Sequence, residues 1–254
     1  ASFGRGFFVL DDYTPLRHVT PEVLDQAATL FPPRHAYQFL PTTPYALRGK
    51  AFFGEGFYTA PNPPHGAVFT YYLKDGLTTK RTARLDADKK TAKAGGDVFY
   101  PPWDALRAED REEAPAVVLT ITDAAGRVVR RLTGPTGPGF HRVSWDLRYP
   151  PTAPTNPQAS IDPDDLFSAL PAGPLAAPGT YTVTLALSVD GKESLVGKAH
   201  AFDVVPVTNT TVTAAERAAD LAFQQSVSRL QGAVLGSVEA ARAARQQLAV
   251  ARQA

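Results

Sequence analysis

The chain has 254 residues, 44% of them hydrophobic, so it is long enough to bury a substantial core. Its 26 Lys and Arg residues are matched by 25 Asp and Glu residues, and this balance favours neither nucleic acid nor an anionic membrane as its partner. The absence of cysteine excludes disulfides, thiolate metal sites and cysteine nucleophiles. No apolar run approaches the roughly 20 residues that a membrane-spanning helix needs.

Residues 1–65 are interrupted by many prolines, including the pairs at 32–33 and 63–64. Proline fixes φ and donates no backbone hydrogen bond, so this stretch is expected to form an extended wrapping linker. One short helix is predicted over residues 21–30, with Thr20 as its N-cap. The first residue is not methionine, and we expect the chain to be a processed or truncated part of a longer protein.

Residues 66–206 alternate between apolar and polar side chains, which is the pattern of strands that bury one face. Strands are expected at residues 66–73, 116–123, 127–133, 143–147 and 181–189. Trp145 lies on the apolar face of its strand and is predicted to be a core residue. Asp and Gly in the segments 123–126 and 190–191 favour tight hairpin turns. The region therefore predicts an antiparallel β-sandwich of the immunoglobulin or fibronectin III type.

Two segments interrupt this predicted sandwich. Residues 74–114 form a charged insertion, in which residues 74–97 would be polar almost all round as a helix and are expected to project as a solvated arm. An acidic partner for this arm, or for Arg130 and Arg131, stays open as the alternative. Residues 150–178 are rich in Pro and Ala and are predicted to be a long loop.

Residues 207–254 have the pattern of a long amphipathic α-helix. Thr213 and Glu216 form a capping-box pattern. Apolar and small residues then follow a 4-3-4-3 spacing, and the expected interaction residues of this stripe are Phe223, Val227, Leu230, Val234 and Leu248. Gly232 and Gly236 leave open whether the segment is one helix or a helix pair. An apolar stripe of this length needs a protein surface to cover it.

No cluster of residues in the sequence points to catalysis, a metal or a cofactor. The five histidines are at least 17 residues apart, so no two form a local metal motif. A glycosidase needs paired carboxylates, and Asp11, Asp12 and Glu55 are the nearest candidates, although neighbours on a strand point to opposite faces. The acidic residues Asp162, Asp164 and Asp165 lack the glycine and distal glutamate of a calcium loop. Trp103, next to two prolines, is a freer aromatic than Trp145 and could stack on a sugar.

Several segments together resemble the C-terminal region of bacterial sortilin-like (VPS10-type) or BNR-repeat glycosyl hydrolase-like proteins, whose main body is a β-propeller. The matching segments at the N-terminal side are GRGFFVLDD at 4–12, TPLR at 14–17, LFPPR at 30–34, GEGFYTAPNPP at 54–64 and GAVFTYYL at 66–73. Residues 121–132, 139–148 and 178–183 are similar to the immunoglobulin-like module of flagellar hook-capping proteins. The Asp-box pattern of the propeller does not occur, so the resemblance implies no catalytic residue here.

The resemblance implies an extracytoplasmic chain, periplasmic or secreted, that acts as a non-catalytic accessory subunit. Its expected partners are the parent propeller or a larger respiratory, photosynthetic or secretion complex, with no nucleic acid, no cofactor and no transmembrane segment of its own. The alternative is an accessory domain of a glycosidase-like or peptidase-like propeller enzyme whose active site lies outside this chain. The resulting prediction is a mainly β chain in three parts, at 1–65, 66–206 and 207–254.

Overall fold

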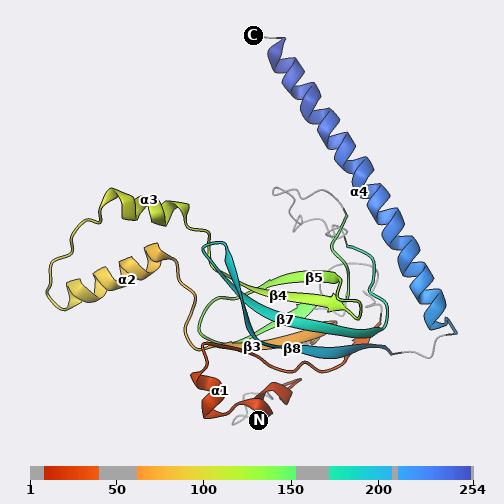
Figure 1. Cartoon of the computed structure of the whole chain (residues 1–254), viewed down its shortest axis with the longest axis horizontal. Coiled ribbons are helices and arrows are strands. Elements are labelled where there is room, and N and C mark those ends of the chain that lie inside the picture. Colours follow the sequence, from red (N-terminus) through yellow and green to blue (C-terminus); the bar gives the residue numbers. More distant parts are fainter. Residues whose placement is uncertain (1–8, 40–61, 153–171, 208–210, 253–254) are drawn as a thin grey trace, which may run out of the picture. The chain divides into compact units, whose positions relative to one another are not determined.

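The structure is a computed structural model that describes residues 9–39, 62–152, 172–207 and 211–252 (Figure 1). The chain divides into two compact units. Unit 1 comprises Ala1–Ala36, Ala67–Trp145 and Thr180–Asp203, and unit 2 comprises Tyr37–Gly66, Asp146–Gly179 and Val204–Ala254. Of the described residues, 36% are helical and 32% lie in strands, so the prediction of a mainly β chain is not confirmed.

The N-terminal region contains two short helices and two short strands. The 3-10 helix η1 spans Thr14–His18, α1 spans Pro21–Asp25, β1 spans Ala28–Leu30 and β2 spans Ala36–Gln38. Thr20 caps α1 as predicted, because its hydroxyl accepts a hydrogen bond from the backbone N–H of Val23 at 3.3 Å. The predicted helix over 21–30 is wrong in its second half. Residues 28–30 instead pair with β3, which buries Ala28 and Leu30.

Six further strands complete two sheets. They are β3 (Ala67–Leu73), β4 (Ala116–Asp123), β5 (Val128–Gly134), β6 (Gly139–Trp145), β7 (Gly179–Val189) and β8 (Lys192–Pro206). The strand orders are β1-β3-β6 and β2-β8-β7-β4-β5, and the pairs β1/β3, β3/β6, β4/β5 and β4/β7 are antiparallel. The strands predicted from alternation are thus confirmed to within one or two residues for β3, β4, β5 and β7. The predicted strand 143–147 is wrong at its ends, because β6 begins at Gly139 and stops at Trp145, and Leu147 has a positive φ of 59°.

Both predicted hairpin turns are present. Asp190 and Gly191 have φ of 53° and 74°, the left-handed values that a tight two-residue hairpin requires, and they join β7 to β8. Between β4 and β5, the Asp123 carboxylate accepts hydrogen bonds from the N–H groups of Ala125 (3.0 Å) and Arg127 (2.9 Å). These local bonds fix the turns and hence the register of the strands beside them.

The core of unit 1 lies where aromatic side chains of the two sheets meet. Trp145 of β6 is fully buried, and its ring centroid lies 5.3 Å from that of Tyr181 on β7 and 6.3 Å from that of Phe202 on β8. Phe69 of β3 contacts Phe202 edge-on at 5.3 Å. The prediction that Trp145 is a core residue is confirmed.

Three longer helices lie outside the sheets. The charged insertion contains α2 (Lys80–Lys93) and α3 (Trp103–Arg111) (Figure 1). No residue of either helix is buried as a whole. The third, α4, spans Ala214–Ala251 without interruption, so the single-helix alternative holds. Thr213 and Glu216 form the predicted capping box. Among the described residues, no helix combines the length and apolar character needed to cross a bilayer.

His200 on β8 makes the stability of unit 1 sensitive to mild acid. Burial lowers the pKa of His200 below its ordinary value of about 6.5, and its ring Nε2–H donates to the Leu30 carbonyl at 3.1 Å. The folded chain therefore binds this proton more weakly than the unfolded chain does. We expect the unfolding midpoint to fall as pH decreases from about 7 to 5.5, and to fall less in His200→Gln. Equal slopes for the two chains in thermal melts across this range would contradict the assignment.

Candidate interaction surfaces

The first candidate surface is the apolar stripe of α4. The five residues predicted to interact are all exposed: Phe223 at 67%, Leu230 at 66%, Leu248 at 62%, Val234 at 53% and Val227 at 46%. They share one face because a spacing of three and four residues returns to the same side of a helix. Val238, 40% exposed, extends the stripe and follows the same spacing. We refer to these six residues as the α4 stripe.

A different face of α4 is covered within unit 2. A Cβ added at Gly232 would lie 3.2 Å from the Thr152 carbonyl oxygen, and the Thr152 hydroxyl donates to the Gln231 side-chain oxygen at 3.2 Å. Leu221, Ser228 and Leu235 on the Gly232 side of the helix are partly buried. The chain therefore packs the Gly232 face and leaves the α4 stripe outward.

The second candidate surface lies on the arm formed by α2 and α3, which pack side by side within unit 1. Arg84 of α2 donates to both carboxylate oxygens of Glu109 on α3, with distances of 2.6 and 2.9 Å, and to Asp88 at 3.2 Å. The Glu109 side chain is only 7% exposed. Hydrogen bonds from Arg84 lower the pKa of Glu109, so the bidentate pair stays charged at neutral pH.

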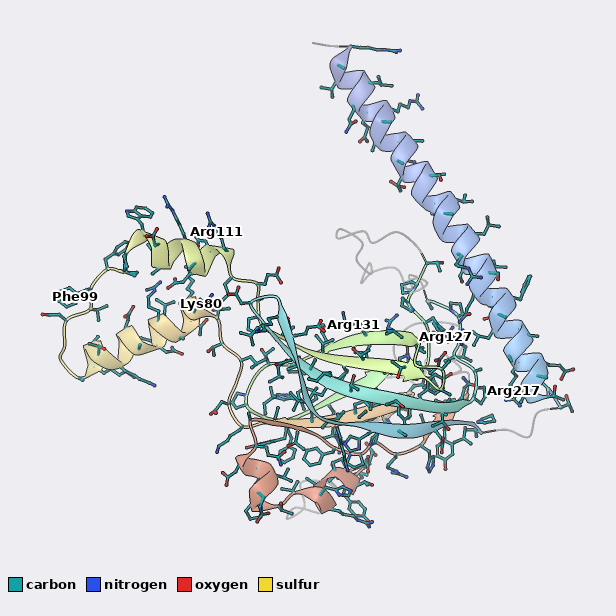
Figure 2. The ribbon with its side chains drawn as sticks, in the orientation of Figure 1. Lys80, Phe99, Arg111, Arg127, Arg131 and Arg217 are labelled. Atoms are coloured by element: carbon teal, nitrogen blue, oxygen red, sulfur yellow. The ribbon has the colours of Figure 1, made fainter. Side chains whose placement is uncertain are left out.

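Further bonds attach the near end of the arm to the sheet. The backbone N–H of Lys80 donates to the Glu112 carboxylate at 2.6 Å, and the Lys80 ammonium pairs with Asp190 in the β7–β8 turn at 2.7 Å. Lys80 and Arg111 lie at this end of the two helices, and Phe99 lies at the opposite end (Figure 2). The arm is thus anchored at one end by charged groups and carries an aromatic residue at the other.

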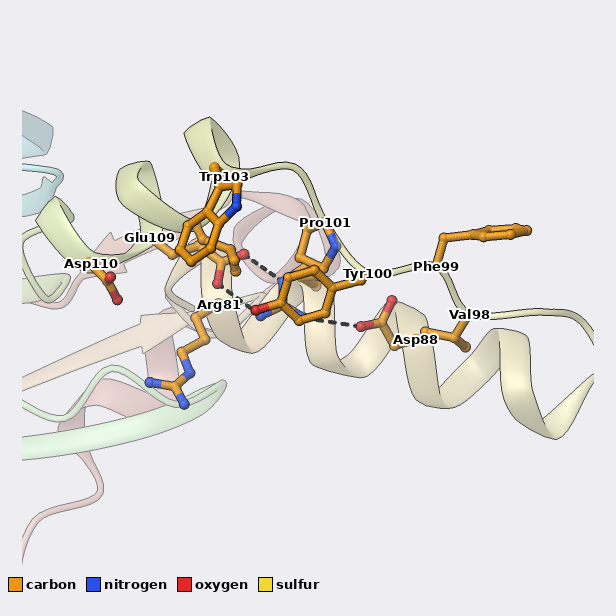
Figure 3. A pocket seen from close by; sticks show the side chains of 11 residues that line it. Arg81, Asp88, Val98, Phe99, Tyr100, Pro101, Trp103, Glu109 and Asp110 are labelled. Atoms are coloured by element: carbon orange, nitrogen blue, oxygen red, sulfur yellow. Dashed lines mark hydrogen bonds and ion pairs between the residues drawn. The ribbon is translucent and has the colours of Figure 1, made fainter.

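Aromatic side chains gather where α2 connects to α3. Phe99 is 83% exposed, Tyr100 81% and Trp103 72%, and Val98 is exposed beside them. A shallow hollow of about 580 Å³ is lined by these residues together with Arg81, Arg84, Asp88, Pro101, Leu106, Glu109 and Asp110. The Tyr100 and Trp103 rings face this hollow, whereas Phe99 points away from it (Figure 3).

The sequence pointed only partly to this aromatic cluster. Trp103 is exposed, as its place beside two prolines suggested, but Phe99 and Tyr100 were not singled out and α3 was not predicted. The sequence did contain a signal for the cluster, namely three aromatic residues within five positions of a charged insertion. Such an insertion has too few apolar residues to form a core that would bury them. The segment that was expected to project as a solvated arm forms the exposed helix α2, and exposed aromatic residues follow it in the chain.

Of the acidic candidates, the structure describes Asp11, which is exposed, and Asp12, which is partly buried. The Asp12 carboxylate accepts from the Thr14 N–H at 2.9 Å and lies 3.8 Å from Arg34, while Arg142 donates to the Asp12 backbone carbonyl. Burial alone would raise the pKa of Asp12, but the hydrogen bonds of Thr14 and the charge of Arg34 lower it. Asp12 therefore closes a turn before η1. Glu55, Asp162, Asp164 and Asp165 lie outside the described residues.

The histidines bond mainly to the backbone. The ring Nε2–H groups of His65 and His141 donate to the carbonyls of Phe39 (3.1 Å) and Gly137 (2.7 Å), and His200 bonds to Leu30 in the same way. In residues 9–39, 62–152, 172–207 and 211–252, no three His, Asp or Glu side chains come together in a group that could hold a metal ion.

No family model matches this chain, and no curated protein or solved structure shows significant similarity to it. The similarity to sortilin-like and BNR-repeat proteins therefore rests on the sequence motifs alone.

Proposed function

We propose that this chain is a non-catalytic protein-interaction module, in which an immunoglobulin-like β-sandwich carries α4 and the α4 stripe is covered by a partner protein. The observation that carries the proposal is the exposure of the stripe: Phe223 and Leu230 are each about two-thirds accessible. Burying such a side chain contributes roughly 1.5–3 kcal/mol, and soluble proteins seldom leave contiguous apolar surface uncovered.

The aromatic core supports the immunoglobulin-like part of the proposal. In such domains two antiparallel sheets pack face to face, and a buried tryptophan lies between them. The fully buried Trp145, which contacts Tyr181 and Phe202 of the other sheet, supports such an arrangement here. The sheets here have three and five strands, which is within the range of this architecture with added edge strands.

The position of the covered face of α4 supports binding of a partner protein to the opposite face. The covered side of α4 is the one with Gly232, where the absence of a side chain permits close approach of Thr152. The apolar side stays available along several turns, the geometry of an amphipathic helix that lies in a groove of another protein. The sequence resemblance supports an extracytoplasmic location and a role as an accessory subunit.

The test is the double variant Phe223→Asp with Leu230→Asp. Two carboxylates on the stripe would be desolvated in an apolar interface, so we expect loss of the chains that co-purify with the protein. The thermal midpoint should stay within a few degrees of that of the unaltered chain, because neither residue lies in the core of unit 1. Native mass measurement and thermal melts supply the two readouts.

A matched control places two aspartates on an exposed part of α4 away from the stripe, as Ala222→Asp with Ala233→Asp. This variant has the same added charge and should keep its partners. If the stripe variant instead unfolds early, the chain covers the stripe itself. If it keeps both its midpoint and its partners, the stripe is no interface and the proposal fails.

A further inference from the structure

The far end of the α2–α3 arm combines exposed aromatic side chains with a cluster of lysines. We define the arm tip as residues 89–103, from the last turn of α2 to the first residue of α3. Its apolar members are Val98, Phe99, Tyr100 and Trp103, and its basic members are Lys89, Lys90 and Lys93, all of them exposed. The arm tip shares no residue with the α4 stripe, and the inference drawn from it does not rest on the proposed function.

The aromatic members have the chemistry of a bilayer interface. Trp and Tyr concentrate at the headgroup level of membranes, where their rings are in an apolar layer and their N–H or O–H groups reach water. Phe on an exposed, lysine-rich segment is typical of surfaces that insert shallowly between headgroups. Phe99 points outward from the end of the arm, in the direction such insertion requires (Figures 2 and 3).

The charge of α2 favours an anionic surface. The helix has six basic and two acidic residues, and Arg84 is neutralised by Glu109 and Asp88. Lys89 is 3.6 Å from Asp86 in a fully solvated pair, which has little strength. Asp97 and Asp104 are close to the aromatic residues in sequence, and Asp88, Glu109 and Asp110 line the hollow with them, so acidic groups oppose the lysines in part. A lysine near an anionic membrane strengthens binding about fivefold, so the local field of the tip matters even though the chain as a whole is nearly neutral.

The three aromatic side chains alone offer too little area for a stable protein interface. Three aromatic side chains that each can bury about 150–250 Å², at the exposures given above, offer on the order of 500 Å². A specific protein complex buries about 800 Å² on each partner. A fluid bilayer needs no such area, because lipids reorganise around a few inserted rings.

We propose that the arm tip docks on an anionic bilayer surface, with Phe99, Tyr100 and Trp103 among the lipid headgroups and the three lysines against their negative charges. The Arg84–Glu109 pair and the bonds of Lys80 hold the two helices together behind the tip. These bonds fix the two helices behind the tip, where Phe99 points outward and Tyr100 and Trp103 face the hollow beside it.

The experiment uses the full chain and sonicated vesicles of phosphatidylcholine, with and without about 30% phosphatidylglycerol. Co-sedimentation should be at least tenfold stronger with the anionic lipid. The two tryptophans supply a second readout, since Trp145 is buried and Trp103 is exposed. The emission of Trp103 should shift to shorter wavelength on binding, and this shift should disappear in Trp103→Phe while sedimentation persists.

Three variants locate the contact. Phe99→Ser with Tyr100→Ser, and Lys89→Gln with Lys90→Gln and Lys93→Gln, should each weaken sedimentation at least tenfold without changing the thermal midpoint. Leu195→Ser removes an apolar side chain that is equally exposed (77%) on β8, and should bind as the unaltered chain does. Binding that is absent, or equal for the two lipids, overturns the proposal.

Two other results would also overturn it. If vesicle binding is lost in Phe223→Asp with Leu230→Asp but kept in the Phe99 and Tyr100 variant, the membrane contact belongs to α4. If the Phe99 and Tyr100 variant loses co-purifying protein while the unaltered chain ignores vesicles, the arm tip is a protein interface.

Discussion

Replacing Trp145 by alanine is expected to lower the free energy of unfolding by about 3–5 kcal/mol, the usual cost of removing a large core aromatic. Trp145 has no exposed surface and contacts Tyr181 and Phe202 of the opposite sheet, so its removal leaves a cavity at the junction of the two sheets. The denaturant midpoint of the full chain measures this change.

Trp103→Ala is the matched control, because it removes the same side chain from an exposed site on α3. Its effect should stay within about 0.5 kcal/mol, as for other surface substitutions. Equal midpoints for the Trp145 variant and the unaltered chain would mean that the two sheets do not pack through Trp145.

Gly134→Ala is expected to destabilise unit 1 by about 1–3 kcal/mol through overpacking. A Cβ at this position would overlap the Tyr71 hydroxyl and lie 3.0 Å from its ring carbons. Tyr71 cannot move away easily, because it is fully buried and its hydroxyl donates to the Pro135 carbonyl at 2.6 Å. The same burial raises the pKa of Tyr71 to about 12.

Tyr71→Phe should relieve this overlap, since the hydroxyl is the atom that a Cβ at Gly134 meets first. The phenylalanine variant alone loses a hydrogen bond that contributes about 1 kcal/mol. In the double variant we expect a smaller loss than the sum of the two single losses, measured by chemical denaturation. Gly137→Ala, where a Cβ meets nothing within 4 Å, is the control and should be nearly neutral. Additive losses would show that the hydroxyl is not the obstacle.

The sheet strands and α4 were the most predictable features of the chain. Alternation of period two marks β3 and β4 because every second residue is fully buried, whereas the residues between them are partly or nearly buried. The capping box at Thr213 marks the start of α4 because it satisfies free N–H groups locally. Where a pattern is produced by residues close in sequence, the sequence alone was enough.

Features that depend on distant residues were missed. The segment 28–30 forms β1 because β3 offers it a partner, although the pattern before it favours a helix. The helix α3 is held to α2 by the ion pair between Glu109 and Arg84. The two residues are 25 positions apart, and no local sequence pattern predicts that they pair. The exposure of Phe99 and Tyr100 likewise follows from the absence of a core near the arm, which only the fold reveals.

The five-stranded sheet ends, in the described part of the chain, on β5. A terminal strand presents unpaired N–H and C=O groups, which can template pairing with another molecule. On β5, Arg130 and Arg131 occupy the middle of the strand, and the Arg131 side chain bonds to Thr120 of β4 (3.4 Å) and to Glu193 of β8 (2.7 Å). A second copy that paired with this edge would bring its own arginines against these, at a cost in charge repulsion. The basic pair would therefore oppose the pairing of two copies at this edge.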